Sequence, residues 1–193
     1  DRQRMHDHAL LTAGRFAGAQ IMYSWRDLEP EKGVYAFSTI RADVDYLAAH
    51  GKKLFIQLQD ASFYVPNQPV PDYILTEAYG GGATYQYTDA GEVEGWVAKR
   101  WLPGVQTRFA ALLSALGAEF DGEIEGINLQ ETSIGVSEKT DASFSPALYA
   151  EGLKANMRAL RSAFPESTTL QYANFMPGEW LPWEDEGYLR GIY

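Results

Sequence analysis

Glu125-Gly126-Ile127-Asn128-Leu129-Gln130-Glu131-Thr132-Ser133 is the stretch of sequence that decides the predicted fold. Its apolar residues are those of a short buried β-strand, and its polar residues gather where that strand would end. Burying such polar groups costs free energy unless they are paired, so a core has no use for them. In α/β proteins, ligands bind at the carboxyl ends of parallel strands. We therefore predict that Glu131 is catalytic, and that Asn128 and Gln130 orient it or bind substrate.

The remainder of the chain alternates between strand-like and helix-like segments. Three further strands are predicted from β-forming residues at 18–25, 53–59 and 168–175. The helices between the strands are predicted from helical spacing and start signals at 38–50, 103–120 and 145–164. Strands that alternate with helices form a parallel sheet with right-handed crossovers. The predicted fold class is therefore α/β.

The strand predicted at 53–59 has two chemically different faces. Its apolar positions would face covering helices, which puts Gln57 and Gln59 on the opposite face. Polar side chains on an inner face near the exit of a strand suit the mouth of a barrel, and Asp60 follows that exit directly. We predict that all three bind substrate. For Asp60, a loop cap and a second catalytic carboxylate are the alternatives.

Residues 61–100 contain no long periodic element, and a connection of this length is unusual between a strand and a helix. A short helix is predicted within it at about 71–79. Long loops in compact domains usually build a site. We therefore predict one domain over residues 1–193, with a long loop on the active-site side at about 61–100.

Bulk composition excludes several classes of function. The 193 residues suffice for one domain, and the formal charge of −10 argues against nucleic acid as a partner. The lack of cysteine excludes disulfides and thiolate chemistry, and no apolar run reaches the length of a membrane span. His6 and His8 have no third ligand nearby, and no phosphate-binding glycine motif is present. No metal, no cofactor and no membrane partner are therefore predicted.

The beginning of the chain leaves the compartment open. Asp1 leads directly into a polar, helix-like stretch, without an initiator Met or a signal peptide. We expect that processing or truncation removed what preceded it, so the missing signal is no evidence for the cytoplasm. A secreted or periplasmic location is the expectation.

The segment Ile-Met-Tyr-Ser-Trp-Arg-Asp-Leu-Glu-Pro-Glu-Lys-Gly-Val-Tyr-Ala-Phe, residues 21–37, resembles the second-strand region of (β/α)8 glycoside hydrolases of clan A. Residues 53–59 look like the third strand of that family, and residues 127–131 fall where its fourth strand delivers the acid/base glutamate. The resemblance implies a TIM barrel, of which this chain supplies only strands two to five. A full barrel takes roughly 250 residues, so the chain is expected to be a fragment. The remaining part of its own barrel is then an expected partner.

What the resemblance implies about function is hydrolysis of an oligo- or polysaccharide by paired carboxylates, with retention expected. Glu131 would be the acid/base, and the nucleophilic glutamate of the seventh strand would lie outside the chain. Two residues depart from the family pattern, since Gln130 stands where it has Asn and Thr132 where Pro is frequent. A non-catalytic carbohydrate-binding barrel is the alternative, and a barrel enzyme of unrelated chemistry is a third possibility.

Four more residues are candidates for contact with the carbohydrate. Trp25 is either a core residue or a platform on which a sugar ring stacks. Tyr172 and Asn174, at the end of the predicted strand 168–175, could bind substrate, and ordinary core packing is the equal alternative for the tyrosine. Trp180 would form part of a sugar-stacking wall or pack as part of the tail.

Overall fold

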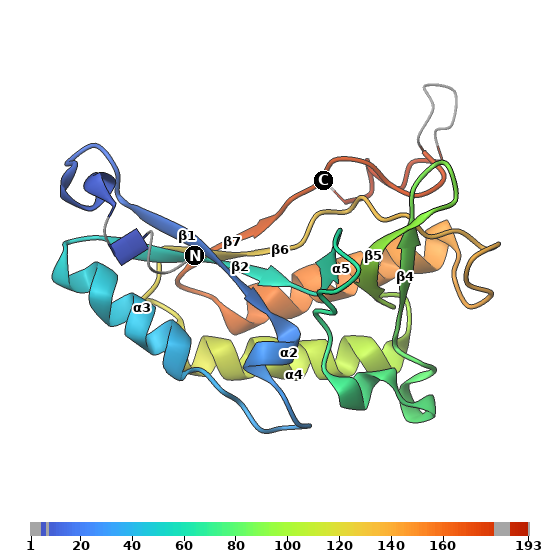
Figure 1. The fold of residues 1–193 in the computed structure, drawn as a ribbon, viewed down its shortest axis with the longest axis horizontal. Helices are drawn as coiled ribbons and strands as arrows, with labels where there is room; N and C mark the ends of the chain where they lie inside the picture. The colour runs from blue at the N-terminus through green and yellow to red at the C-terminus, as the bar shows by residue number, and fades with distance from the viewer. Residues whose placement is uncertain (1–4, 7, 180–185, 193) are drawn as a thin grey trace.

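The computed structural model describes residues 5, 6, 8–179 and 186–192 of the chain (Figure 1). Its centre is a four-stranded parallel sheet of order β1-β2-β6-β7. The strands are β1 (Gly18–Ser24), β2 (Lys53–Gln59), β6 (Gly126–Leu129) and β7 (Thr168–Gln171). All four predicted strands are therefore present, and β7 ends earlier than predicted, at Gln171. The predicted α/β class with a parallel sheet is confirmed.

Three long helices lie on one side of this sheet (Figure 1). They are α3 (Ser38–Ala49), α4 (Pro103–Phe120) and α5 (Pro146–Ala163), and each connects two neighbouring strands. Proline at the first position suits α4 and α5, because the amide that proline lacks has no partner there in any helix. The hydroxyl of Ser145 caps α5 by accepting from the amide of Leu148. This helix-after-strand order is that of a (β/α) barrel.

The strands bury one face and leave the other open. Along β2, Leu54, Ile56 and Leu58 are almost fully buried in the core formed with the helices. Alternation therefore places Gln57 and Gln59 on the opposite, inner face, as predicted. The pairing register aligns a row of inner-face residues across the sheet: Met22, Gln57, Asn128 and Leu170. The outer members of this row, Met22 and Leu170, are 59% and 50% exposed, so the described residues leave the inner face open at its two borders.

The segment predicted as a long loop contains more regular structure than expected. It forms a three-stranded antiparallel sheet of order β3-β5-β4 beyond the end of the parallel strands (Figure 1). The strands are β3 (Ala61–Ser62), β4 (Ala83–Tyr87) and β5 (Val93–Ala98). Two short 3-10 helices, η2 (Asp72–Leu75) and η3 (Glu77–Tyr79), replace the helix predicted at 71–79. Gln86 faces Gly95 and Tyr87 faces Val93, so Glu94 is an extra, bulged residue that interrupts the two-residue period of β5.

A second core joins this small sheet to α5 and to the loop that follows β6. Trp101, Phe144 and Tyr149 pack edge to face or tilted, with ring centroids 5.0 to 6.4 Å apart. Around them lie buried aliphatic residues of β5 and of the loop, including Val97, Ile134 and Val136. The small sheet is therefore fixed to the end of the barrel segment at which β6 exits. Within the described residues, no helix is long and apolar enough to cross a bilayer.

Candidate active site

Glu131 lies two residues beyond β6, past the last paired residue of that strand. Leu129 is buried in the core under the helices, and Gln130 lines the same small cavity as Leu129, Phe109 and Leu153. The carboxylate of Glu131 is in contact with Asn174, which follows the neighbouring strand β7. The Glu131 side chain is half-buried. This arrangement is what a barrel needs to present a carboxylate from the end of a strand.

The carboxylate of Glu131 is held by Asn174. The side-chain amide of Asn174 donates to Oε2 of Glu131 across 2.5 Å. The oxygen of the same amide accepts from the backbone amides of Ser133 and Phe175, and Thr132 Oγ1 lies 3.1 Å from it. Asn174, three residues past β7, thus joins the exits of two neighbouring strands.

Side chains from other segments hydrogen-bond to the backbone carbonyls of residues 130–132. The carbonyl of Gln130 accepts from Nε2 of Gln171 at 2.7 Å, and that of Glu131 accepts from Nη1 of Arg100 at 2.9 Å. The carbonyl of Thr132 accepts from the hydroxyl of Tyr149 at 2.9 Å. Three successive carbonyls therefore each receive a side-chain hydrogen bond, from three separate segments of the chain.

Asp60 is the carboxylate partner of Arg100. It is 3% exposed and receives two parallel hydrogen bonds from Arg100, at 2.8 Å from Nε and 2.7 Å from Nη2. Nη1 of Arg100 also donates to the hydroxyl of Tyr149 at 2.7 Å. Asp60 was predicted to bind substrate, but its burial and its pairing leave it no surface for a ligand. Asp60 is therefore a buried structural partner of Arg100.

Two of these buried groups keep one protonation state over the ordinary pH range. Burial by itself would lower the pKa of Arg100, but the adjacent Asp60 carboxylate outweighs burial and raises it. Burial raises the pKa of the Tyr149 phenol to about 12, against the opposing effect of Arg100. Arg100 thus stays charged, and Tyr149 stays a hydroxyl that donates to Thr132.

The inner face supplies further polar groups. Nε2 of Gln20 donates to Oδ1 of Asn128 across 2.7 Å, reaching over β2 from β1 to β6. Asn128 is 7% exposed, whereas Gln57 and Gln59 are half-buried on the same face. Tyr172, at the exit of β7, is 61% exposed. Gln57, Gln59 and Tyr172 are therefore predicted binding residues that remain partly or largely exposed, as does Asn174, whose amide is bonded to Glu131.

Three other predictions have different outcomes. Trp25 is fully buried in the main core and donates through Nε1 to Glu29, so it belongs to the core and is no sugar platform. Gln130, predicted to bind substrate or orient Glu131, is 8% exposed and turned toward the helices. Trp180 lies outside the described residues.

Sequence reasoning missed Arg100, Tyr149 and Gln171. Arg100 ends the segment predicted as a long loop, and Tyr149 lies within the helix predicted at 145–164. Their partners are 31 and 17 residues away in the sequence, so no local pattern connects them. The one available signal was an arginine directly before the apolar Trp101-Leu102-Pro103, because a buried arginine requires a carboxylate partner.

Comparisons with known proteins show similarity in fold alone. No protein-family model matches the sequence, and no curated protein matches it either. Solved structures do match. GH5_18 from Streptomyces cattleya in complex with GlcNAc has a TM-score of 0.61 at 15% identity, over 88% of this chain and 38% of that one. An endogalactoceramidase has a TM-score of 0.58 at 16% identity, over 90% of this chain and 43% of that one.

A third match is GH5_18 from Bifidobacterium longum, with a TM-score of 0.56 at 15% identity, over 86% of this chain and 37% of that one. The chain thus spans well under half the length of the structures it matches. The fold is part of a (β/α)8 barrel of the kind found in clan A glycoside hydrolases, which confirms the predicted resemblance at the level of fold.

Proposed function

We propose that this chain is the part of a barrel glycoside hydrolase that carries its general acid/base, Glu131. The observation that carries the proposal is the Glu131–Asn174 pair, in which a half-buried carboxylate at the exit of an inner strand is oriented by an amide from the next strand. A general acid must hold its proton at a fixed position beside the leaving oxygen. The proposal is also supported by the matched structures, which are those of glycoside hydrolases.

The proposed substrate is a β-linked oligo- or polysaccharide. Gln57, Gln59 and Tyr172 supply amide groups and an aromatic ring on the open side of the sheet, where sugar hydroxyls and an apolar sugar face find partners. One matched structure is described as a complex with Manb1-4GlcNAc, a β-linked disaccharide. Asn128, already bonded to Gln20, would help to shape this surface.

The proposed mechanism needs a second carboxylate. Glu131 would protonate the leaving oxygen while a carboxylate outside the 193 residues attacks the anomeric carbon. Retention requires the two groups to lie about 5 to 5.5 Å apart, whereas inversion requires about 6.5 to 9.5 Å. Retention is our proposal, and the stereochemistry of the first-formed sugar, followed by NMR, decides it.

The decisive experiment replaces Glu131 by Gln in the intact protein and measures hydrolysis of aryl β-glycosides. Loss of the general acid should lower kcat by about 10²- to 10⁴-fold on substrates with poor leaving groups. The loss of kcat/KM should be much smaller for dinitrophenyl glycosides, whose leaving group needs no proton. Their kcat should still fall, because Glu131 would also activate the water that hydrolyses the glycosyl-enzyme. Glu125→Gln is the matched control, because Glu125 lies at the other end of the same strand, exposed beside Lys53. Equal activity of Glu131→Gln and the wild type would refute the proposal.

A non-catalytic carbohydrate-binding barrel is the second candidate. The observation that favours it is the pairing of Asp60, the alternative second catalytic carboxylate, with Arg100, which leaves Asp60 buried. Oligosaccharide binding measured by calorimetry, together with no hydrolysis by the intact wild-type protein, would select this function over catalysis.

A further inference from the structure

A buried chain of hydrogen bonds holds the backbone of the segment that follows β6. The chain runs from the Asp60 carboxylate to the Arg100 guanidinium, then to the Tyr149 hydroxyl, and ends on the carbonyl of Thr132. A branch from Arg100 ends on the carbonyl of Glu131. Arg100 and Tyr149 are 2% and 0% exposed, so water does not compete for these bonds.

We infer that Asp60, Arg100 and Tyr149 are positioning residues, which hold the backbone at 131 and 132 so that the Glu131 carboxylate stays beside Asn174. This inference rests on the proposed function for its catalytic meaning. The three residues touch no surface available to a substrate, so they act through Glu131 alone.

Geometry explains why an arginine is required at position 100. Its planar fork supplies two parallel bonds to Asp60 and leaves Nη1 free to reach the carbonyl of Glu131 and the Tyr149 hydroxyl. A lysine ammonium is a single point donor and cannot reach these acceptors together. Asp60 stands at the end of β2 and Tyr149 on α5, so the fork joins strand, helix and loop.

The backbone of Arg100 is closely packed against α5. Gly152 of α5 packs against the backbone of Arg100, and a Cβ at that glycine would lie 2.1 Å from the Arg100 carbonyl oxygen. That same carbonyl accepts from Nε2 of Gln106 at 2.9 Å. The backbone and the side chain of Arg100 are therefore both fixed, as a positioning residue requires.

Tyr149→Phe is the test variant, because it removes only the hydroxyl and keeps the ring among Trp101 and Phe144. Arg100→Lys is the second variant, since it keeps the charge opposite Asp60. Tyr23→Phe is the matched control: Tyr23 is 5% exposed and donates to Asp43 at 2.6 Å on the helix side of the sheet. All variants are made in the intact protein.

The first readout is NMR of the intact protein, which needs no activity. Tyr149→Phe should speed amide exchange at Ser133 by about tenfold, the equivalent of one lost hydrogen bond. It should also shift the side-chain amide resonances of Asn174, which report contact with Glu131. Arg100→Lys should do the same, and Tyr23→Phe should change neither signal. Unchanged signals in Tyr149→Phe, or equal changes in Tyr23→Phe, would overturn the inference.

The second readout is turnover by the intact protein. Tyr149→Phe should lower kcat about tenfold with KM within twofold, because the loss concerns the aim of Glu131 and leaves the sugar contacts intact. An equal fall of kcat in Tyr23→Phe would show a general loss of structure and count against positioning. If the wild type hydrolyses nothing, the proposed function fails, and the NMR result still decides whether the three residues hold Glu131.

Discussion

The amide of Asn174 and the carboxylate of Glu131 meet at 2.5 Å, although 43 positions separate them in the sequence. The contact forms because β6 and β7 are neighbours whose register places Leu129 opposite Gln171. Two loops that leave adjacent strands are thereby joined by a direct side-chain hydrogen bond.

Asn174→Ala should lower kcat of the intact protein by about 10²-fold, since the carboxylate loses its donor and a misplacement of about 1 Å is enough for such a loss. KM should change little. Kinetics on aryl glycosides make the measurement. Asn67→Ala, a truncation at an exposed turn residue, serves as control and should leave both constants unchanged.

Asp60→Ala should destabilise the chain by about 3 to 5 kcal/mol, because it leaves the Arg100 charge buried without a partner. The double variant Asp60→Ala/Arg100→Met should cost clearly less than the sum of the two single changes. Urea unfolding followed by circular dichroism measures all four members of the cycle. Additive losses would mean that the pair is not coupled.

Asp141 should contribute to stability in a pH-dependent manner. Burial raises the pKa of its carboxyl, but hydrogen bonds from Ser143 and the ion pair with Lys99 outweigh burial and lower the pKa below its ordinary value. A carboxyl with a lowered folded pKa stabilises the fold above its unfolded pKa of about 3.9 and loses that effect as pH falls further.

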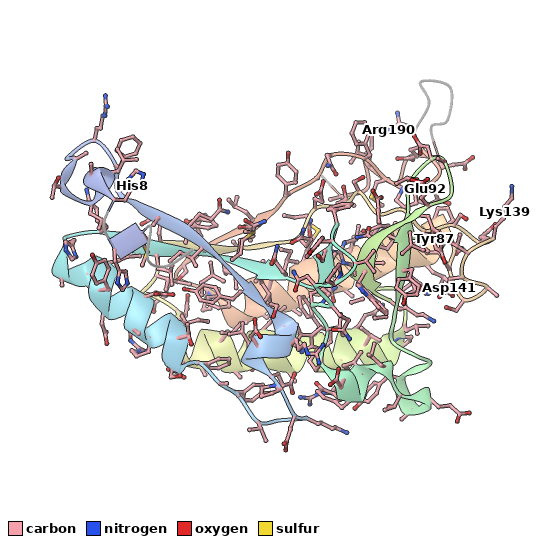
Figure 2. The ribbon with its side chains drawn as sticks, in the orientation of Figure 1. His8, Tyr87, Glu92, Lys139, Asp141 and Arg190 are labelled. Carbon is pink, nitrogen blue, oxygen red and sulfur yellow. The ribbon has the colours of Figure 1, made fainter. Side chains whose placement is uncertain are left out.

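Asp141→Asn should therefore cost on the order of 1 kcal/mol at pH 7, and the difference from wild type should shrink below about pH 4. Figure 2 shows Asp141 at the same end of the molecule as Tyr87 and Lys139, far from His8. Denaturation midpoints from pH 2 to 7 provide the measurement. A constant difference across this range would contradict the ion-pair interpretation.

Two helix glycines should respond to alanine in opposite directions. Gly104 has its nearest neighbour 3.5 Å from an added Cβ, so Gly104→Ala should stabilise α4 by about 0.5 to 1 kcal/mol. Gly152→Ala should destabilise the chain, because its Cβ would meet the Arg100 carbonyl oxygen at 2.1 Å. Thermal unfolding of both variants tests this pair, and a stabilised Gly152→Ala would show that α5 shifts freely.

The position of Glu131 could be predicted because the signals are local. Closely spaced apolar residues indicate a buried strand, and the polar residues at the end of that strand follow directly in the sequence. Asn174 was predicted for the same reason, at the end of the next strand.

The role of Asp60 could not be predicted in this way, because its partner is 40 residues distant and emerges from a segment that looked unstructured. The antiparallel sheet of β3, β4 and β5 was hidden for a similar reason. Its strands are short, and one of them is broken by a bulge. Gly95 lies so close to β3 that an added Cβ would meet the Ser62 oxygen at 1.7 Å, a constraint visible only in three dimensions.

Among the described residues, the parallel sheet begins at β1 and stops at β7. Each border strand keeps a row of amides and carbonyls that can pair with another strand. Because side chains alternate with a period of two, a polypeptide that docked one position out of phase would turn its inward residues outward. The two border strands therefore fix the register of any strand that pairs with the sheet on either side of Glu131. A register error there would misalign the reacting groups even where binding was tight.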